Sequence, residues 1–251
     1  MQAVISIFLF IFGAFTGSFL NLISDRLPNG RKIVFGRSMC DFCKKTLRVK
    51  NLVPIFSFLF QRGKCSFCGE KLSFYYPFSE IFTGAVFILA GYLSGFVNVI
   101  NSQTIFLLFY YLVIFSFFVT MFLTDIKYYL ILDVLVIPAV VFVFLSSVIF
   151  RGLDLINLHK RLSSDTIGVY LLRTSYFTDN LGYSLKDLGL VILGAVLISL
   201  FFLFLIFITK GRGMGFGDVK LGFLIGLVNG FPLGIIAIFL GFTLGAVYSV
   251  T

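Results

Sequence analysis

Tryptophan is absent from this 251-residue chain, histidine occurs once, and charged residues make up only 12% of it. Without tryptophan, tyrosine and phenylalanine must supply any aromatic anchors at a membrane surface. Apolar residues dominate the chain instead. Its residues are 59% hydrophobic and its mean hydropathy is +1.05, whereas soluble domains are nearer to about 45–50% apolar. The composition therefore predicts a membrane protein.

Long apolar stretches recur along the chain, and several exceed the roughly 18–20 residues needed to cross a bilayer. Lipid offers the backbone no hydrogen-bond partners, so the spans must be helices or a closed barrel. The runs of Leu, Phe and Ile have no alternating polar face, which argues against a barrel. The sequence predicts an all-α polytopic membrane protein with about seven transmembrane helices, of which the sixth is short and holds several glycines. The expected spans lie near residues 2–24, 78–99, 104–124, 130–150, 188–209, 216–230 and 232–250.

Basic residues set the expected orientation. The first span lacks the features of a cleavable signal, which are a basic segment in front and a small-residue cleavage site behind. Of the 20 Lys and Arg residues, 11 fall in 25–76, which predicts a cytoplasmic insert there and an N-terminus outside. The expected parts are a first transmembrane helix at 1–24, the insert at 25–76, and a membrane core at 77–251 with an external loop at 151–187. Because the basic residues follow membrane sidedness, the net charge of +9 indicates contact with anionic membrane lipid and no binding of nucleic acid.

Two aspartates stand where a carboxylate is least expected. Asp125 ends one apolar run, and Asp218 precedes another in the sequence Gly215-Phe216-Gly217-Asp218. An ionised aspartate at a membrane boundary is costly and usually functional. Two expected spans, an even number, separate the pair, so both carboxylates should lie at the cytoplasmic membrane face. We expect them to act as an acid–base pair, with the glycines freeing the backbone near Asp218 for close approach or for a positive φ.

Simpler interpretations of the acidic residues stay open. Asp218 could serve only as a helix N-cap, and Asp125 could be only a boundary charge. Asp133 falls in the first turn of the fourth expected span, where it could orient the pair or merely cap the helix. Glu80, near the start of the second span, should face protein or a polar cavity, unless it only places a favourable charge at a helix N-terminus. Asp25, directly after the first span, is interpreted as a boundary charge.

Four cysteines form two Cys-x-x-Cys pairs, Cys40 with Cys43 and Cys65 with Cys68, and 21 residues separate the pairs. Four thiolates can surround Zn²⁺ tetrahedrally in a closed structural site. Disulfides fit a cytoplasmic insert poorly, while a redox role and free thiols stay open as alternatives. The insert has few apolar residues with which to build a core, so a metal could supply the missing folding free energy. We therefore expect a small zinc-ribbon-like insert.

Short motifs spread along nearly the whole chain point to one family. They are 17–21 with 26–28, the two cysteine pairs with 51–54 and 62–65, 76–77 with Glu80 and 83–84, Asp125 with Asp133 and Pro138, and 213–220. Taken jointly, they resemble the motifs of the type IV prepilin peptidases, membrane aspartyl proteases of the Gly-x-Gly-Asp kind. Gly-x-Gly-Asp alone would be a weak signal.

The resemblance implies an enzyme with Asp125 and Asp218 as its catalytic residues. It implies cleavage of the leader of prepilins and pseudopilins after a Gly, at the cytoplasmic face of the bacterial cytoplasmic membrane. It also implies that the new N-terminal amine is methylated with S-adenosylmethionine. The resemblance associates Glu80 and the zinc insert with that reaction. The matching positions around the aspartates, taken as supporting, are Gly215, Gly217, Lys220 and Asp133.

The chain departs from the family pattern at two places. Leu132 stands where the family usually has Pro before the second aspartate of the first block. The family usually continues into an eighth helix, whereas this sequence ends at Thr251. We therefore expect about seven spans without the eighth.

Two other function classes are compatible with the residues. A transporter or channel for cations could also place aspartates at helix ends. A membrane scaffold without enzymatic activity could dock partners through a zinc ribbon. Replacing each aspartate with Asn and measuring leader removal separates these hypotheses from the protease.

Overall fold

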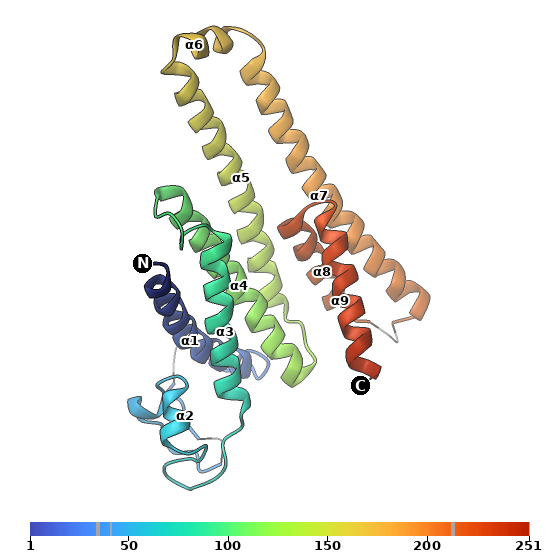
Figure 1. The fold of residues 1–251 in the computed structure, drawn as a ribbon. Coiled ribbons are helices and arrows are strands. Elements are labelled where there is room, and N and C mark those ends of the chain that lie inside the picture. Colours follow the sequence, from blue (N-terminus) through green and yellow to red (C-terminus); the bar gives the residue numbers. More distant parts are fainter. Residues whose placement is uncertain (34–35, 41, 212–213, 251) are drawn as a thin grey trace. The chain divides into compact units, whose positions relative to one another are not determined.

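The computed structural model is built mainly of helices (Figure 1) and describes residues 1–33, 36–40, 42–211 and 214–250. Within these ranges there is no β-strand, and the only β pairing consists of isolated bridges. The all-α class expected from the sequence is therefore confirmed.

The chain divides into two compact units, Met1–Leu135 and Val136–Thr251, and each is described by itself. The helices of the first unit are α1 (Gln2–Arg26), the 3₁₀ turn η1 (Val49–Asn51), α2 (Phe56–Phe60), α3 (Tyr75–Leu93), α4 (Ser102–Tyr128) and the first residues of α5 (Asp133–Ser163). Those of the second unit are the rest of α5, α6 (Thr166–Arg173), α7 (Tyr176–Thr209), α8 (Phe216–Asn229) and α9 (Leu233–Val250).

The helices α1, α3, α4, α5 and α7 are each long and apolar enough to cross a membrane. They correspond to the first five expected spans and support a polytopic membrane protein. Helix α8 has 14 residues. At 1.5 Å per residue it extends about 21 Å, less than the roughly 30 Å of a hydrocarbon core. The total of seven spans, with α8 and α9 as the last two, stays a prediction.

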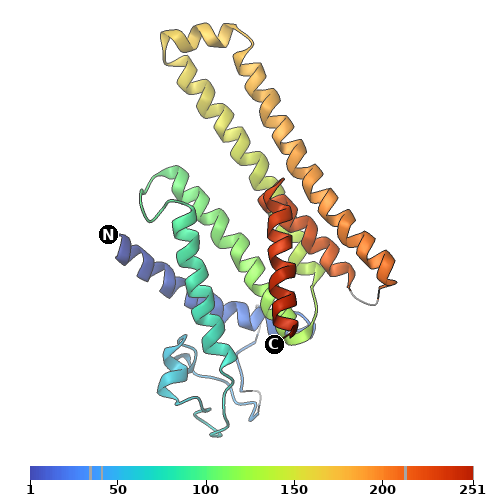
Figure 2. The same cartoon turned by 45° about the vertical axis from the view of Figure 1, so that its right-hand side comes forward.

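The segment 151–187, expected as an external loop, is mostly helical instead. Helix α5 continues to Ser163, α6 follows, and α7 already begins at Tyr176. The outer parts of α5 and α7 run side by side in both views of the ribbon (Figures 1 and 2), and an ion pair of 2.6 Å joins Arg151 to Asp187. Hydropathy did not reveal this helical structure, because a fall in hydropathy marks where a helix leaves lipid, whereas the helix itself ends only where its backbone bonding stops. The external position of 151–187 stays a prediction.

Glycines set the helix spacing of the first unit. A Cβ at Gly17 would lie 2.7 Å from Oγ1 of Thr83, and one at Gly13 would lie 2.8 Å from Cα of Gly84. Only glycine permits α1 and α3 to approach so closely, as is usual for helices packed in membranes. Leu20, Val119 and Leu123 then form a buried cluster between α1 and α4.

Small residues also bring α8 against α7 in the second unit. A Cβ at Gly226 would lie 2.5 Å from Cα of Ala195, and one at Gly222 would meet the ring of Phe202 at 2.5 Å. This packing fixes the face that α8 turns toward α7, and with it the first turn of α8.

Candidate functional site

Asp125 lies in the last turn of α4. The helix begins at a capping box, in which Oδ1 of Asn101 accepts the Thr104 N–H at 2.8 Å and Oγ1 of Thr104 accepts the Asn101 N–H at 3.1 Å. It ends at Tyr129, whose φ of 53° is left-handed and whose N–H donates to the Asp125 carbonyl at 2.8 Å. The exposed Asp125 side chain is thus placed at the very end of a candidate membrane span.

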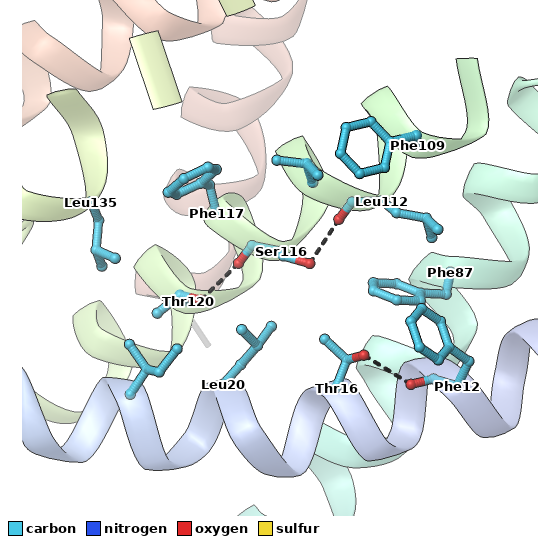
Figure 3. Close-up of a pocket in the computed structure, with 12 residues that line it drawn as sticks. Phe12, Thr16, Leu20, Phe87, Phe109, Leu112, Ser116, Phe117, Thr120 and Leu135 are labelled. Atoms are coloured by element: carbon cyan, nitrogen blue, oxygen red, sulfur yellow. Dashed lines mark hydrogen bonds between the residues drawn. The ribbon is translucent and has the colours of Figure 1, made fainter. Parts of the chain in front are cut away.

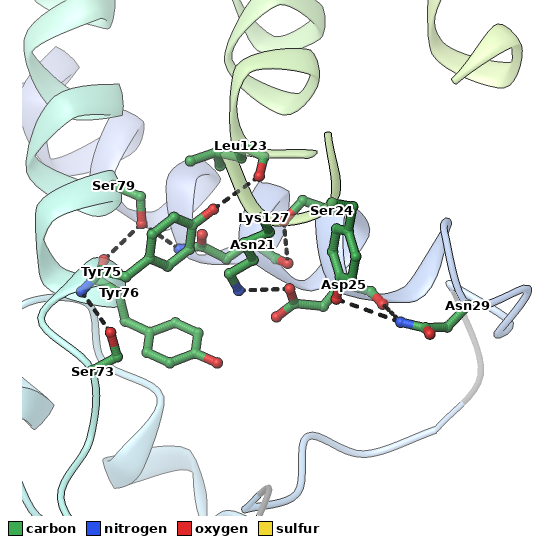
Figure 4. Close-up of polar contacts among 11 residues, drawn as sticks. Asn21, Ser24, Asp25, Asn29, Ser73, Tyr75, Tyr76, Ser79, Leu123 and Lys127 are labelled. Carbon is green, nitrogen blue, oxygen red and sulfur yellow. Dashed lines mark hydrogen bonds and ion pairs between the residues drawn. The ribbon is translucent and has the colours of Figure 1, made fainter. Parts of the chain in front are cut away.

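A polar brace of Asp25, Lys127, Tyr75 and Tyr76 holds this end of α4 (Figure 4). Nζ of Lys127 lies 2.6 Å from Oδ1 of Asp25, at the end of α1. The same ammonium stands 4.2 Å from the ring centre of Tyr75 and 5.0 Å from that of Tyr76, both in the first turn of α3. Cation–π contacts and an ion pair therefore join three helices two residues after Asp125.

The brace was missed by the sequence interpretation, which took Asp25 as a plain boundary charge. Its signal was present, because Asp25 and Lys127 have opposite charge and end two spans at the same expected membrane face. The Tyr75 hydroxyl adds a hydrogen bond of 3.3 Å to the Leu123 carbonyl, two residues before Asp125. One further basic residue was missed: the Arg26 guanidinium donates to the carbonyls of Lys32, Ile33 and Gly36 and so folds the start of the insert back on α1.

Asp218 is the third residue of α8, and Gly215 is its N-cap. Oδ2 of Asp218 accepts the Gly215 N–H at 3.0 Å, so the carboxylate binds a backbone donor at the helix start. Asp218 is therefore not the N-cap itself but the N3 residue that caps the same helix start, and the alternative that it only stabilises this start stays open. A carboxylate in the first turn of a helix is stabilised by the unpaired N–H groups there.

Gly215 and Gly217 do not have the positive φ that the sequence analysis offered as one reason for the glycines. Gly217 lies within α8, and Gly215 has a φ of −95°, which any residue adopts. Gly211 has a positive φ of 71°, where it ends α7, and Gly213 lies outside the described residues. Gly215 is the N-cap of α8 and Gly217 lies in its first turn, and close approach of the backbone at these glycines stays a prediction.

The other two supporting residues fall near helix starts. Asp133 is the first residue of α5, as expected, and Lys220 is the fifth residue of α8, half-buried. Asp125 and Asp133 belong to the first unit, and Asp218 and Lys220 to the second. The pairing of Asp125 with Asp218 therefore stays a prediction from topology.

Glu80 is buried in α3, with 8% of its surface exposed. It is the sixth residue of the helix, beyond the first turn, so the alternative of a favourable N-terminal charge is wrong. Oε2 of Glu80 accepts the N–H of Ile55 at 2.7 Å, and Ser18 of α1 is another hydrogen-bond partner of the carboxylate. Glu80 thus ties the insert to two membrane helices.

The four cysteines converge in the insert. Their sulfur atoms all lie within 4.8 Å of one another, and Cys40 and Cys68 are 4.0 Å apart. A tetrahedral zinc ion with Zn–S bonds of about 2.3 Å would hold its sulfurs about 3.8 Å apart, so the set fits the metal with little adjustment. All four are free thiols, which excludes the disulfide alternative in this structure.

Both cysteine pairs have the same local fold. The N–H of Lys44 donates to the Cys40 carbonyl at 2.9 Å, and the N–H of Gly69 donates to the Cys65 carbonyl at 2.9 Å. Lys44 and Gly69, each directly after a second cysteine, have left-handed φ values of 55° and 71°. The repeated turn aims two sulfurs from each pair at a common centre.

The thiols differ in acidity. Backbone N–H groups of Cys68 and Phe67 hydrogen-bond the sulfur of Cys65 and lower its pKa to about 7. The N–H of Glu70 lowers the pKa of Cys68, but loss of hydration and the neighbouring thiols have the larger effect and raise this pKa to about 11. One sulfur is thus readily a thiolate, and a bound cation would favour deprotonation of the others.

An apolar cavity of about 390 Å³ lies beside α4 in the first unit (Figure 3). The hydroxyls of Thr16, Ser116 and Thr120 on its wall donate to carbonyls of their own helices, so they leave the wall apolar in character. Thr120 lies five residues before Asp125, which places one end of the cavity about one and a half turns from that carboxylate. The lining residues are Phe12, Thr16, Leu20, Ile23, Phe87, Phe109, Leu112, Val113, Ser116, Phe117, Thr120 and Leu135.

Comparison with known proteins identifies the family. Residues 11–93 match the Bacterial Peptidase A24 N-terminal domain, and residues 112–250 match the Type IV leader peptidase family. The second match alone covers more than half of the chain. The chain belongs to the type IV leader peptidase family.

Relatives of this leader peptidase agree over most of its length. A protein of Bacillus subtilis named prepilin leader peptidase/N-methyltransferase is 33% identical over 96% of the chain and 80% of its own length. A protein of the same name from Stutzerimonas stutzeri is 27% identical over 94% of the chain and 77% of its own. One from Klebsiella pneumoniae is 38% identical over 35% of the chain and 41% of its own. No solved structure matched the chain. The enzyme class expected from the sequence, a prepilin peptidase, is therefore confirmed.

Proposed function

We propose that this leader peptidase cleaves prepilins and pseudopilins after a Gly at the cytoplasmic membrane face, with Asp125 and Asp218 as its acid–base pair. One observation carries the proposal. Asp125 ends α4, Asp218 begins α8, and the two candidate spans between them are α5 and α7. An even number of crossings returns the chain to the side from which it started, which supports a common membrane face for both carboxylates.

The mechanism follows from two neighbouring carboxylates. Like charges a few ångströms apart do not both ionise readily, so one member of such a pair holds a proton. The ionised member takes a proton from water, and the resulting nucleophile attacks the scissile carbonyl. The protonated member polarises that carbonyl and then donates its proton to the leaving amine. A substrate cut at the membrane face keeps its apolar segment in the bilayer, and the cavity beside α4 suits such a segment.

We also propose that Cys40, Cys43, Cys65 and Cys68 hold one structural zinc ion. Four thiolates leave zinc no open position for substrate, so its contribution is to the folding of the insert. Purified, reduced protein should contain about one zinc per chain. Cys40→Ser should lose the metal, whereas Ser38→Ala, two residues earlier, should keep it. Elemental analysis that finds no zinc in the unaltered protein would contradict the assignment.

N-methylation with S-adenosylmethionine is the second proposed activity, and the names of the relatives support it. Glu80 does not fit a direct contact with this cofactor, because its carboxylate is buried and already accepts the Ile55 N–H. We therefore derive no step of methyl transfer through Glu80. Its proposed contribution is to hold the insert against α1 and α3.

The proposed orientation places Met1 and the α5–α7 connection outside, and the insert and Lys210 in the cytoplasm of a bacterium. Single cysteines introduced into a chain without its native cysteines test this with a membrane-impermeant thiol reagent on intact cells. A cysteine at Ser164 should react and one at Lys210 should not. The opposite pattern would put the aspartates on the wrong face for leader cleavage.

Co-expression with a prepilin tests both activities at once. Mass spectrometry of the prepilin should find the loss of its leader, and an additional methyl group on the new N-terminus if the transferase is active. An unchanged mass would contradict leader cleavage. It would leave cation transport and partner docking as the functions to examine.

A further inference from the structure

The insert exposes a patch of large apolar side chains on and beside α2. Phe60 is 85% exposed, Phe74 77%, Leu59 63% and Phe56 59%. Phe78, in the first turns of α3, is also exposed. We call these five residues the α2 patch. So much apolar surface in one place on a water-facing insert would be unfavourable and typically marks a binding surface.

The patch has a defined geometry. Phe56, Leu59 and Phe60 occupy positions i, i+3 and i+4 of α2, which places them on one face of the helix. Phe58, on the other face, packs its ring 5.2 Å from that of Phe74. This contact sets α2 beside the start of α3, a candidate membrane span, so the patch continues directly into lipid-facing surface.

Glu80 fixes the depth of α2. The Ile55 N–H that precedes α2 donates to Glu80, five residues after Tyr75, the first residue of α3. At 1.5 Å per residue, the Glu80 backbone lies about 7.5 Å along α3 from its start, and helix side chains lean back toward that start, so the bond lies within the first turns of α3. Tyr75 and Tyr76 suit the headgroup level, as aromatic side chains do at membrane interfaces. Interfacial helices sit about 5–10 Å into the headgroup and acyl boundary, which is the level that the Glu80 bond gives to α2.

The backbone of Ile55 also indicates that the position of α2 is held by its surroundings. Ile55 has a φ of 62° and a ψ of −55°. A β-branched residue adopts a positive φ only where the surroundings require it. Here the bond to buried Glu80 supplies that requirement and turns the chain into α2.

The charges around the patch complement an anionic surface. Residues 25–76 hold 11 basic residues against three acidic ones, a net charge of +8. Lys50 precedes α2, Arg62 and Lys64 follow it, and all three are exposed. None of these three forms an ion pair with a carboxylate of the described residues. Each basic side chain near an anionic bilayer contributes about 1 kcal/mol of attraction.

We propose that the α2 patch is inserted in the headgroup boundary of the membrane that α3 spans, with Lys50, Arg62 and Lys64 against anionic phospholipid. The insert is then held at the membrane surface at two places, through Glu80 and through lipid. The proposal does not depend on the cleavage reaction.

The absence of tryptophan makes a direct test available. The full-length, zinc-loaded chain with Phe60→Trp has a single tryptophan, which is excited selectively at wavelengths where its 11 tyrosines do not absorb. Leu59→Trp provides a second variant if the first folds poorly. In vesicles of phosphatidylcholine and phosphatidylglycerol, the emission should be blue-shifted. Brominated acyl chains should quench it at least about twofold, because the ring lies at the acyl boundary. Iodide in the aqueous phase should quench it little.

Phe67→Trp is the matched control. The Lys45 ammonium stands 5.7 Å from the centre of the Phe67 ring, and an ammonium stays hydrated, so this position should lie in water. Its emission should be quenched by iodide and not by bromine. If the emission of Phe60→Trp behaves like this control, the α2 patch lies in water and the proposal is wrong. Blue-shifted emission that neither quencher reaches would mean that the patch is covered by protein, which overturns the proposal equally.

Discussion

Asp125 and Asp218 carry the same carboxylate group, but different kinds of contact position them. The end of α4 that presents Asp125 is held by Asp25 of α1 and by two tyrosines of α3 through Lys127. The start of α8 is organised locally, by the bond of Asp218 to the Gly215 N–H three residues before it. One aspartate is thus positioned by contacts between distant segments, and the other by its own helix turn.

The helix ends also differ in polarity. Asp125 stands at a helix C-terminus, where unpaired carbonyls disfavour negative charge, and Asp218 stands in a first turn, where N–H groups favour it. Three predictions examine this comparison.

The largest effect is expected from the aspartates themselves. Asp125→Asn and Asp218→Asn should each lower leader cleavage by about 10²–10⁴-fold or more, since each removes a proton donor or acceptor. Gel-based cleavage of a prepilin measures this, and Asp187→Asn on the exposed end of α7 is the matched control. Near-normal cleavage by either variant would contradict the acid–base pair, because only one carboxylate would then be needed.

A smaller effect is expected from the polar brace. Lys127→Met should destabilise the protein by about 1–2 kcal/mol and lower cleavage about tenfold, because Lys127 is half-buried and orients the turn that holds Asp125. Lys127→Arg should restore most of the activity. Arg151→Met is the control: it removes a different ion pair, whose Asp187 side chain is 67% exposed, and should cost about 0–1 kcal/mol with no change in cleavage. Equal losses in the two Met variants would show that the brace has no special relation to Asp125.

The smallest effect is expected at the N-cap of α8. Gly215→Ala keeps the N–H that Asp218 accepts, and among the described residues a Cβ there has only the N of Gly217 within 4 Å, at 3.9 Å. It should cost about 1 kcal/mol or less and change cleavage only a few-fold. Gly215→Pro deletes the N–H and should lower cleavage further. If both variants are equally inactive, Gly215 is required for close approach of substrate and not for its N–H.

Much of the architecture followed from the sequence alone. The helical class and the membrane-crossing segments α1, α3, α4, α5 and α7 were predictable because lipid admits few backbone solutions. The four-cysteine cluster was predictable because two Cys-x-x-Cys turns supply four soft ligands. The family was recognisable from motifs around Asp125 and Asp218. All of these signals are local in the chain.

The tertiary structure decided which distant residues meet. Nothing local assigns Asp25 to Lys127, 102 residues away, or the Ile55 N–H to Glu80. Hydropathy also ended α5 too early, because it measures contact with lipid and does not detect helix caps. A sequence determines the kind of partner that a buried or boundary charge needs, whereas the packing of helices at glycines such as Gly17 determines which partner comes within reach.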